Sequence, residues 1–272
     1  MLTLLVACSE YVVDGKEQNP GGETVEESRP VEDTGDPKES EPVDSGGEII
    51  DPPEDSDPTV ATESIYVHTS TTLFSYDPAT NTAARIGDFK EGGSRITDMT
   101  DIAIDMNGHM WGGAFTRLYE IDPRSGACTY VRALPDNATG LTFLSDGRLV
   151  IAGSALRFYD PATNQTSVLV GGGTYTTSGD IVGLPDGYLY WTVTSWSGGD
   201  GLVRVDPNSG STTYVGDLSA SALYGVGYAN GTLYGFSSWG TIIGIDPSNA
   251  RNISTNSVNQ TWWGATTNPV RW

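Results

Sequence analysis

Two aspartates, Asp101 and Asp180, are the residues of this chain best placed to do chemistry together. Each opens a short apolar run that ends in a glycine turn, Asp101-Ile-Ala-Ile-Asp-Met-Asn-Gly108 in one copy and Asp180-Ile-Val-Gly-Leu-Pro-Asp-Gly187 in the other. Two carboxylates can serve as the acid and base of a hydrolase or hold a cation such as Ca²⁺. Alternatively, Asp101 and Asp180 have no chemical role and only form hydrogen bonds in the interior of the protein.

Five other aspartates form a second candidate set, because each precedes a proline in a recurring segment such as Leu202-Val-Arg-Val-Asp206-Pro-Asn-Ser-Gly210. The proline fixes φ at the first turn position, and the Asn or Gly three residues after it tolerates a positive φ. We therefore interpret these aspartates as acceptors of hydrogen bonds within their own turns. The last copy has Ala250 at the glycine position and is expected to form the least regular turn. The set comprises Asp77, Asp122, Asp160, Asp206 and Asp246.

The elements that must position these side chains are β-strands. Apolar residues alternate with period two before each Asp-Pro pair, and no helical periodicity persists. A second element recurs about every forty residues, in which Asn-Gly or Asp-Gly separates two apolar runs, the strongest local signal for a hairpin. Together the two hairpins make a four-stranded unit, the blade of a β-propeller. The glycines that mark the repeat are Gly108, Gly147, Gly187 and Gly231.

The ends of the repeat region predict how the ring closes. Ser64-Ile-Tyr-Val-His68 matches the second strand of a blade, and Thr261-Trp-Trp-Gly-Ala-Thr-Thr-Asn-Pro269 matches the missing first strand. One blade shared between the two ends would close the ring and remove exposed sheet edges. Residues 62–272 are therefore expected to form an all-β, five-bladed propeller with a narrow central channel.

The repeated Asp-Gly-x-Leu-Tyr and Leu-Tyr-x-Ile-Asp-Pro-x-Thr-Gly elements resemble those of bacterial surface propellers of the NHL and gluconolactonase-like superfamily. In lactonase-like members, a Glu, Asn and Asp set holds a divalent metal in the channel. Aligning the blades places two carboxylates at the start of the innermost strands, but no Glu or Asn, so no metal ligand is assigned. The aligned positions are Asp101, Gly140, Asp180, Tyr224 and Trp262.

Aromatic residues are the more informative candidates for binding. The segment Thr194-Ser-Trp-Ser-Gly-Gly-Asp-Gly201 surrounds Trp196 with small residues that cannot bury it locally. An exposed Trp beside Gly and Asp suits a sugar ring or an apolar patch of a partner. Tyr224, Trp239 and Trp262 are expected on the same face of the ring. For the two tryptophans of this group, packing between blades is the alternative.

The N-terminal region has a different character. Leu5-Val-Ala-Cys8 resembles the lipobox of bacterial lipoproteins, which implies acylation of Cys8, with Ser9 favouring the outer membrane. The apolar run before it is short for a signal peptide, so residues 1–8 are interpreted as the remnant of a longer signal. Residues 9–61 are rich in Glu, Asp, Pro, Gly and Ser, which predicts a disordered acidic tether.

Composition narrows the functional classes. The net charge is −21, and residues 1–61 hold 17 acidic but only three basic side chains, which argues against a nucleic-acid partner. The two histidines, His68 and His109, lack zinc-ligand spacing, and the few glutamates after residue 61 are hard to place as a catalytic acid.

We therefore expect a monomeric, non-enzymatic propeller that is anchored to the cell envelope and binds a glycan or an envelope protein through its loop face. No cofactor is expected beyond a Ca²⁺ ion in the channel. The alternative is a lactone- or glycan-acting hydrolase with Asp101 and Asp180 at the channel mouth.

Overall fold

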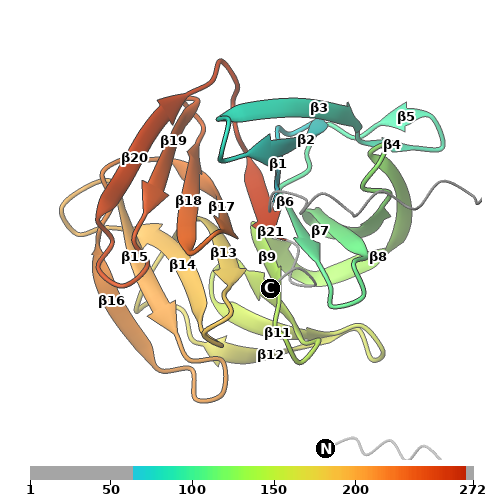
Figure 1. Cartoon of the computed structure of the whole chain (residues 1–272). Coiled ribbons are helices and arrows are strands. Elements are labelled where there is room, and N and C mark those ends of the chain that lie inside the picture. Colours follow the sequence, from blue (N-terminus) through green and yellow to red (C-terminus); the bar gives the residue numbers. More distant parts are fainter. Residues whose placement is uncertain (1–63, 268–272) are drawn as a thin grey trace, which may run out of the picture. The chain divides into compact units, whose positions relative to one another are not determined.

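The computed structural model describes residues 64–267, in which all regular structure is β-strand. The strands form five sheets, which are the five blades of a β-propeller (Figure 1). Within this part of the chain, no helix is long and apolar enough to cross a membrane. Cys8 and the predicted tether at residues 9–61 lie outside the described residues.

Each blade is described from its innermost strand outward. The first consists of β21 (Gly264–Thr267), β1 (Ile65–His68), β2 (Thr72–Asp77) and β3 (Thr82–Asp88). The second consists of β6 (Asp101–Ile104), β7 (Met110–Ile121) and β8 (Ala127–Ala138), with the short β4 (Lys90–Glu91) and β5 (Ser94–Arg95) added beyond β8.

The other three blades follow in chain order. The third consists of β9 (Gly140–Phe143), β10 (Leu149–Ala152), β11 (Leu156–Asp160) and β12 (Gln165–Val170). The fourth consists of β13 (Thr177–Gly183), β14 (Leu189–Thr194), β15 (Asp200–Val205) and β16 (Thr212–Asp217). The fifth consists of β17 (Leu223–Ala229), β18 (Thr232–Ser237), β19 (Thr241–Ile245) and β20 (Asn252–Ser257).

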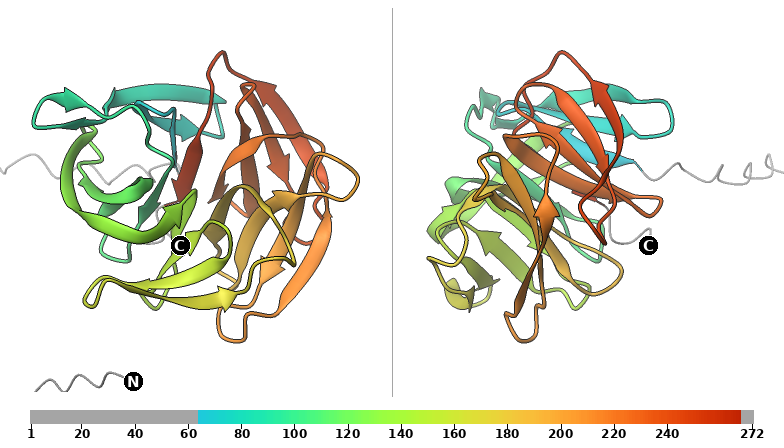
Figure 2. Two further views of the ribbon diagram at one scale, coloured as in Figure 1. Left: turned by 180° about the vertical axis from the view of Figure 1, so that it is seen from behind. Right: turned by 90° about the vertical axis from the view of Figure 1, so that its left-hand side faces the viewer.

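The five inner strands surround a common axis. β6 contacts β9, β9 contacts β13, β13 contacts β17, and β21 contacts both β17 and β6. Figure 2 shows the blades radiating from this centre when the ring is turned to its reverse side. Because every inner strand begins its blade, all five run in the same direction along the axis, and their first residues meet at one mouth.

The ring closes as the sequence predicts. β21 pairs antiparallel with β1, with Gly264 opposite His68 and Thr267 opposite Ile65. The N–H of Trp263 donates a hydrogen bond to the His68 carbonyl at 2.8 Å, which extends this pairing by one residue. The last strand therefore occupies the inner edge of the first blade, and the paired ends hold the ring shut.

Apolar side chains fill the spaces between neighbouring blades. Trp262 is fully buried and lies edge-on to Phe74 and Phe236, with ring centroids 5.5 and 6.1 Å away. These rings come from the first and fifth blades, so the contact joins the blades where the ring closes. Burying aromatic rings of this size contributes strongly to stability.

The Asp-Pro turns have the structure predicted for them. In the first, the Ala79 N–H donates to Asp77 Oδ1 at 2.8 Å, and the other four copies repeat this bond. The expectation that the last turn is least regular is wrong. Ala250 adopts a φ of 59°, and its N–H donates to the Asp246 carbonyl at 2.9 Å, as Gly210 does to Asp206 at 2.8 Å.

Candidate functional site

A column of five residues, one from each inner strand, surrounds the axis. Asp101, Gly140 and Asp180 occupy it as expected, but Gly225 and Gly264 take the places assigned to Tyr224 and Trp262. In β6, Ile104 pairs with Met110, whereas in β17 the equivalent Tyr228 pairs with Leu233. The fifth-blade turn is therefore one residue shorter, which moves Tyr224 out of the column.

The two carboxyl groups act as a hub between blades. Asp101 Oδ2 accepts a hydrogen bond from the N–H of Leu141 in the next blade. Asp180 Oδ2 accepts one from the N–H of Val226 at 2.7 Å and a longer one from the N–H of Ala265 at 3.3 Å. Both aspartates are fully buried. The pair thus ties together inner strands from all five blades.

Burial and mutual repulsion set the protonation of the hub. Burial, and then the nearby Asp180 charge, raise the pKa of Asp101 well above its usual value. Burial raises the pKa of Asp180 to about 7, although hydrogen bonds from Asp101 and from backbone N–H groups oppose the rise. Two neighbouring carboxyls cannot both ionise easily, so the pair keeps at least one proton at neutral pH.

His68 is a third member of the hub, although the sequence suggested no role for it. Its side chain is fully buried, and Nε2 lies 3.8 Å from Asp101 Oδ1. Nδ1 lies 2.9 Å from the Thr69 carbonyl, whereas Nε2 has no hydrogen-bond partner. Burial lowers the pKa of His68 to about 4, so the imidazole is neutral at physiological pH. Any charge that the hub carries at physiological pH is therefore negative and comes from its carboxyl groups.

A pocket of about 230 Å³ opens at the mouth of the axis, where the inner strands begin. Many of its lining residues stand immediately before column residues: Thr100 before Asp101, Gly179 before Asp180, and Trp263 before Gly264. Since a strand rises about 3.3 Å per residue, the hub lies roughly one residue step below this pocket. We call it the axial pocket; its lining is Thr100, Phe115, Thr139, Thr177, Ser178, Gly179, Tyr224 and Trp263.

The loops between the second and third strands emerge at the same end of the blades. In the fourth blade, this loop presents Trp196 with 87% of its surface exposed. The indole stacks on Tyr214, with centroids 6.1 Å apart and planes within 7°, and Tyr214 in turn stacks on Tyr175. Trp196 is therefore exposed as its small neighbours predict, and it is also held in place.

Hydrogen bonds fix the loop that carries Trp196. The hydroxyls of Ser195 and Ser197 donate to opposite oxygens of Asp217, and the Tyr214 hydroxyl donates to the same carboxylate. These bonds, that of Ser195 first, lower the pKa of Asp217. An ionised carboxylate and hydroxyls thus lie beside the exposed indole.

The remaining aromatic candidates divide into two groups. Trp239, in the equivalent loop of the fifth blade, is 79% exposed, and Tyr224 is 39% exposed at the axial pocket. Trp262 is buried completely, so its expected place on the binding face is wrong and its packing alternative holds. Its neighbour Trp263 lines the pocket instead. The inner strand of the first blade begins at Gly264, two residues later than the blade alignment places it.

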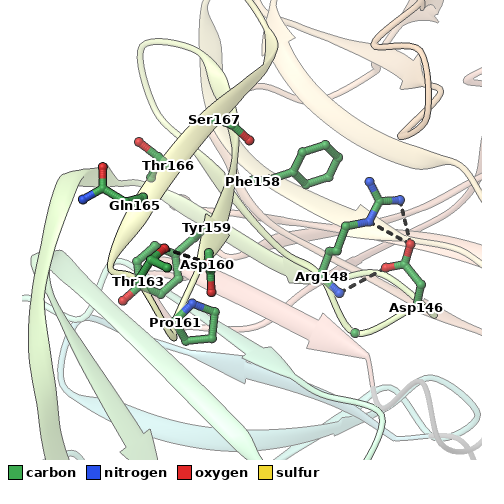
Figure 3. Close-up of a pocket in the computed structure, with 11 residues that line it drawn as sticks. Asp146, Arg148, Phe158, Tyr159, Asp160, Pro161, Thr163, Gln165, Thr166 and Ser167 are labelled. Atoms are coloured by element: carbon green, nitrogen blue, oxygen red, sulfur yellow. Dashed lines mark hydrogen bonds and ion pairs between the residues drawn. The ribbon is translucent and has the colours of Figure 1, made fainter.

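A second concave surface lies on the Asp-Pro side of the third blade, with a volume of about 550 Å³. Figure 3 shows the Arg148 guanidinium between Asp146 and Phe158. Arg148 Nε donates to Asp146 Oδ2 at 2.7 Å, and the guanidinium lies 4.4 Å from the centroid of the phenyl ring. The Arg148 charge is therefore already paired with Asp146. The Asp160 carboxylate accepts a hydrogen bond from Ala162 within its own turn.

Metal ligation has little support in the described part of the chain. Between residues 64 and 267, no group of three or more His, Cys, Asp or Glu side chains is arranged to hold an ion. The hub offers two carboxyls and one imidazole, but Gly264 lies against His68 and Asp101 so closely that even a Cβ would clash.

Comparisons with known proteins show the fold alone. No family model and no curated protein match this chain. Among solved structures, one reported under "The de novo evolutionary emergence of a symmetrical protein is shaped by folding constraints" is 16% identical with a TM-score of 0.52, and covers 76% of this chain and 98% of that one.

Two further structures are more distant. U3-55K is 11% identical with a TM-score of 0.44 over 72% of this chain, which spans 61% of that protein's length. The extracellular domain of the putative one component system BT4673 from B. thetaiotaomicron is 14% identical, with a TM-score of 0.43 over 74% of this chain and 28% of that one. Function must be argued from the site.

Proposed function

We propose that this protein is a non-enzymatic carbohydrate-binding propeller that uses the loop face around Trp196. The observation that carries the proposal is an indole that is 87% exposed yet stacked on Tyr214, in a loop that hydrogen bonds to Asp217 hold in place. Flexible surface tryptophans lose entropy on binding, whereas a fixed one loses little. A flat aromatic ring bordered by a carboxylate and hydroxyls suits a sugar ring, which has an apolar face and a polar edge.

The carboxylate beside the indole supplies the polar half of such a site. Asp217 is exposed and ionised, with Ser195, Ser197 and Tyr214 donating to it. A carboxylate has lone pairs for further donors, so it can also accept a hydrogen bond from a sugar hydroxyl. Trp239, presented by the equivalent loop of the neighbouring blade, extends the same face.

Binding of the full-length protein to a glycan array, followed by calorimetry on each hit, tests this proposal. Trp196→Ala is expected to weaken binding about tenfold or more, because aromatic anchors in binding sites typically contribute over 1 kcal/mol. Tyr130→Ala is the matched control, since Tyr130 is an exposed ring on the outer strand β8. An array without hits, or hits that Trp196→Ala leaves unchanged, would refute it. If the protein bound an envelope protein and no glycan, the ligand of the Trp196 face would be that protein and the glycan proposal would be wrong.

Display at the cell envelope is the second part of the proposal, and its support is the Leu5-Val-Ala-Cys8 motif followed by an acidic segment. Charge repulsion would extend that segment and hold the propeller away from a membrane surface. The chain has only two cysteines, which makes a clean test possible. Palmitate labelling should vanish in Cys8→Ala and persist in Cys128→Ala, and labelling that survives Cys8→Ala would exclude the anchor.

The hydrolase alternative has less support. A catalytic carboxyl must come within hydrogen-bond reach of the substrate. The side chains of Asp101 and Asp180 are both fully buried, and their oxygens bind backbone N–H groups of neighbouring blades. Turnover of a lactone or glycoside panel that is abolished in Asp180→Asn, in a variant that still folds, would reverse this conclusion.

A further inference from the structure

The axial pocket is a separate feature of the same face, and three aromatic rings give it its character. Phe115, Tyr224 and Trp263 come from the second, fifth and first blades and, with five smaller residues, line an open pocket of about 230 Å³. Phe115 is 43% exposed and has a φ of 52°, a conformation that a bulky residue rarely adopts. Backbone strain of this kind tends to occur at binding sites.

The hydroxyl groups of the pocket wall are largely occupied within the protein. Thr100 Oγ1 donates to the Ala138 carbonyl at 2.7 Å, and Thr139 Oγ1 donates to the Ala152 carbonyl at 3.0 Å. Thr177 Oγ1 accepts a hydrogen bond from Trp191 Nε1 at 3.1 Å. The threonine hydroxyls are therefore engaged within the protein, whereas Ser178 Oγ is buried without a hydrogen-bond partner among the described residues.

Beneath this apolar wall lie buried carboxyls without a cationic partner. Asp101 and Asp180 are one residue step below Thr100 and Gly179. Asp200, 6% exposed, accepts a hydrogen bond at 2.7 Å from the N–H of Leu223, the residue before Tyr224. Of the ion pairs formed within residues 64–267, none joins a Lys or Arg to any of these three aspartates.

We propose that the axial pocket binds a small organic cation, a quaternary ammonium group, held by Phe115, Tyr224 and Trp263 above the carboxyl hub. Aromatic faces carry negative potential and attract such cations, most strongly where water is excluded. Quaternary ammonium groups carry no N–H and need no hydrogen-bond acceptor, which suits a wall whose threonine hydroxyls are engaged within the protein. The buried carboxyls act through their field rather than by contact, and a low-dielectric interior transmits that field well.

Binding is coupled to protonation of the hub. The groups facing the axis are His68 from β1, Asp101 from β6 and Asp180 from β13, with Asp200 from β15 farther out. A cation in the pocket favours the ionised form of Asp180, whose pKa is raised to about 7 by burial. Affinity should therefore increase between pH 6 and pH 8, while His68, with a pKa lowered to about 4, stays neutral.

The test compares choline with 3,3-dimethyl-1-butanol, its neutral isostere, by calorimetry on the full-length protein at constant ionic strength. Choline is expected to bind about tenfold more tightly than the isostere, the size of effect that cation–π contacts give. Tyr224→Leu keeps an apolar side chain but removes the ring, and should abolish most of this preference. Tyr130→Leu is its matched control, because Tyr130 is 44% exposed and Tyr224 39%.

The charge beneath the pocket is tested separately. Asp180→Asn, which removes the carboxyl that ionises near pH 7, should weaken choline binding at pH 8 and leave isostere binding unchanged, and the pH series on the unmodified protein gives the same information if that variant does not fold. Equal affinity for choline and the isostere, or binding that does not depend on pH between 6 and 8, would overturn the proposal. Because the readout is choline rather than a glycan, the result is independent of the Trp196 experiment.

Discussion

The substitution Asp180→Asn should destabilise the protein at acid pH and stabilise it at alkaline pH. The Asp180 side chain accepts three backbone N–H bonds, from Ile181, Val226 and Ala265. Asn offers one acceptor oxygen, so at least one buried N–H loses its partner, a loss of about 1–3 kcal/mol. At pH 4, where the aspartic acid is protonated in the folded state, the variant should therefore be the less stable protein.

The ionisation of Asp180 works in the opposite direction as the pH rises. Its pKa is about 7 in the folded protein and 3.8 in an unperturbed chain. Between these values the unfolded state loses its proton and the folded state keeps it, so the free energy of unfolding falls as pH rises, and it levels off above 7. A shift of this size corresponds to about 4 kcal/mol. Asn cannot ionise, so the variant lacks this loss of stability. Without the Asp180 charge, Asp101 also ionises more easily.

The two stability curves should therefore cross. Urea unfolding followed by tryptophan fluorescence, at intervals from pH 4 to pH 8.5, measures the difference between variant and parent. We expect that difference to change by about 4 kcal/mol in favour of the variant. Asp246→Asn is the control, because hydrogen bonds from Ser248 lower the pKa of that exposed carboxyl and its contribution is constant from pH 5 to pH 8. A difference between Asp180→Asn and parent that does not vary with pH would refute this account of the hub.

Three other substitutions test separate parts of the structure. Phe115→Gly should raise the melting temperature, since it relieves a left-handed backbone conformation worth about 1–2 kcal/mol, and it should weaken choline binding. Gly264→Ala should lower soluble yield and melting temperature strongly, because the added methyl group would collide with His68 and Asp101. Trp262→Ala should destabilise the ring by about 3–5 kcal/mol in urea unfolding, in contrast to the exposed Trp196, whose replacement should leave stability nearly unchanged.

Local sequence signals were sufficient for the architecture. Each Asp-Pro and Asn-Gly pair specifies its own turn, so the hairpins, the repeat and the shared first blade could all be predicted without long-range information. The left-handed turn at Ala250 shows the limit of that approach. A residue ordinarily unsuited to positive φ adopts it there because the flanking strands β19 and β20 pair with each other and determine the turn between them.

Which residues surround the axis could not be predicted in full, because the answer depends on pairing between distant strands that no single repeat encodes. Asp101 and Asp180 were identifiable, but His68 enters the hub only because β1 pairs with a strand almost two hundred residues away. Likewise, Trp263 rather than Trp262 faces the pocket because β21 begins two residues later than the blade alignment suggests. Register between distant strands is set by side-chain packing on both faces, and a one-residue error reverses which side chain points inward.

The narrowness of a five-bladed axis explains why its carboxyls are separated from its accessible surface. Three of the five column positions are glycines, and a Cβ on Gly225 would come within 2.8 Å of the Gly264 backbone. Two carboxyls therefore share the column with three closely packed glycines, the His68 imidazole lies beside them, and all three side chains are fully buried. Their charge can still act on whatever enters the mouth one step above. In such a ring, chemistry by direct contact is confined to the rim, where Tyr224, Trp263 and the loop tryptophans lie, and the buried acids determine which charge that rim prefers.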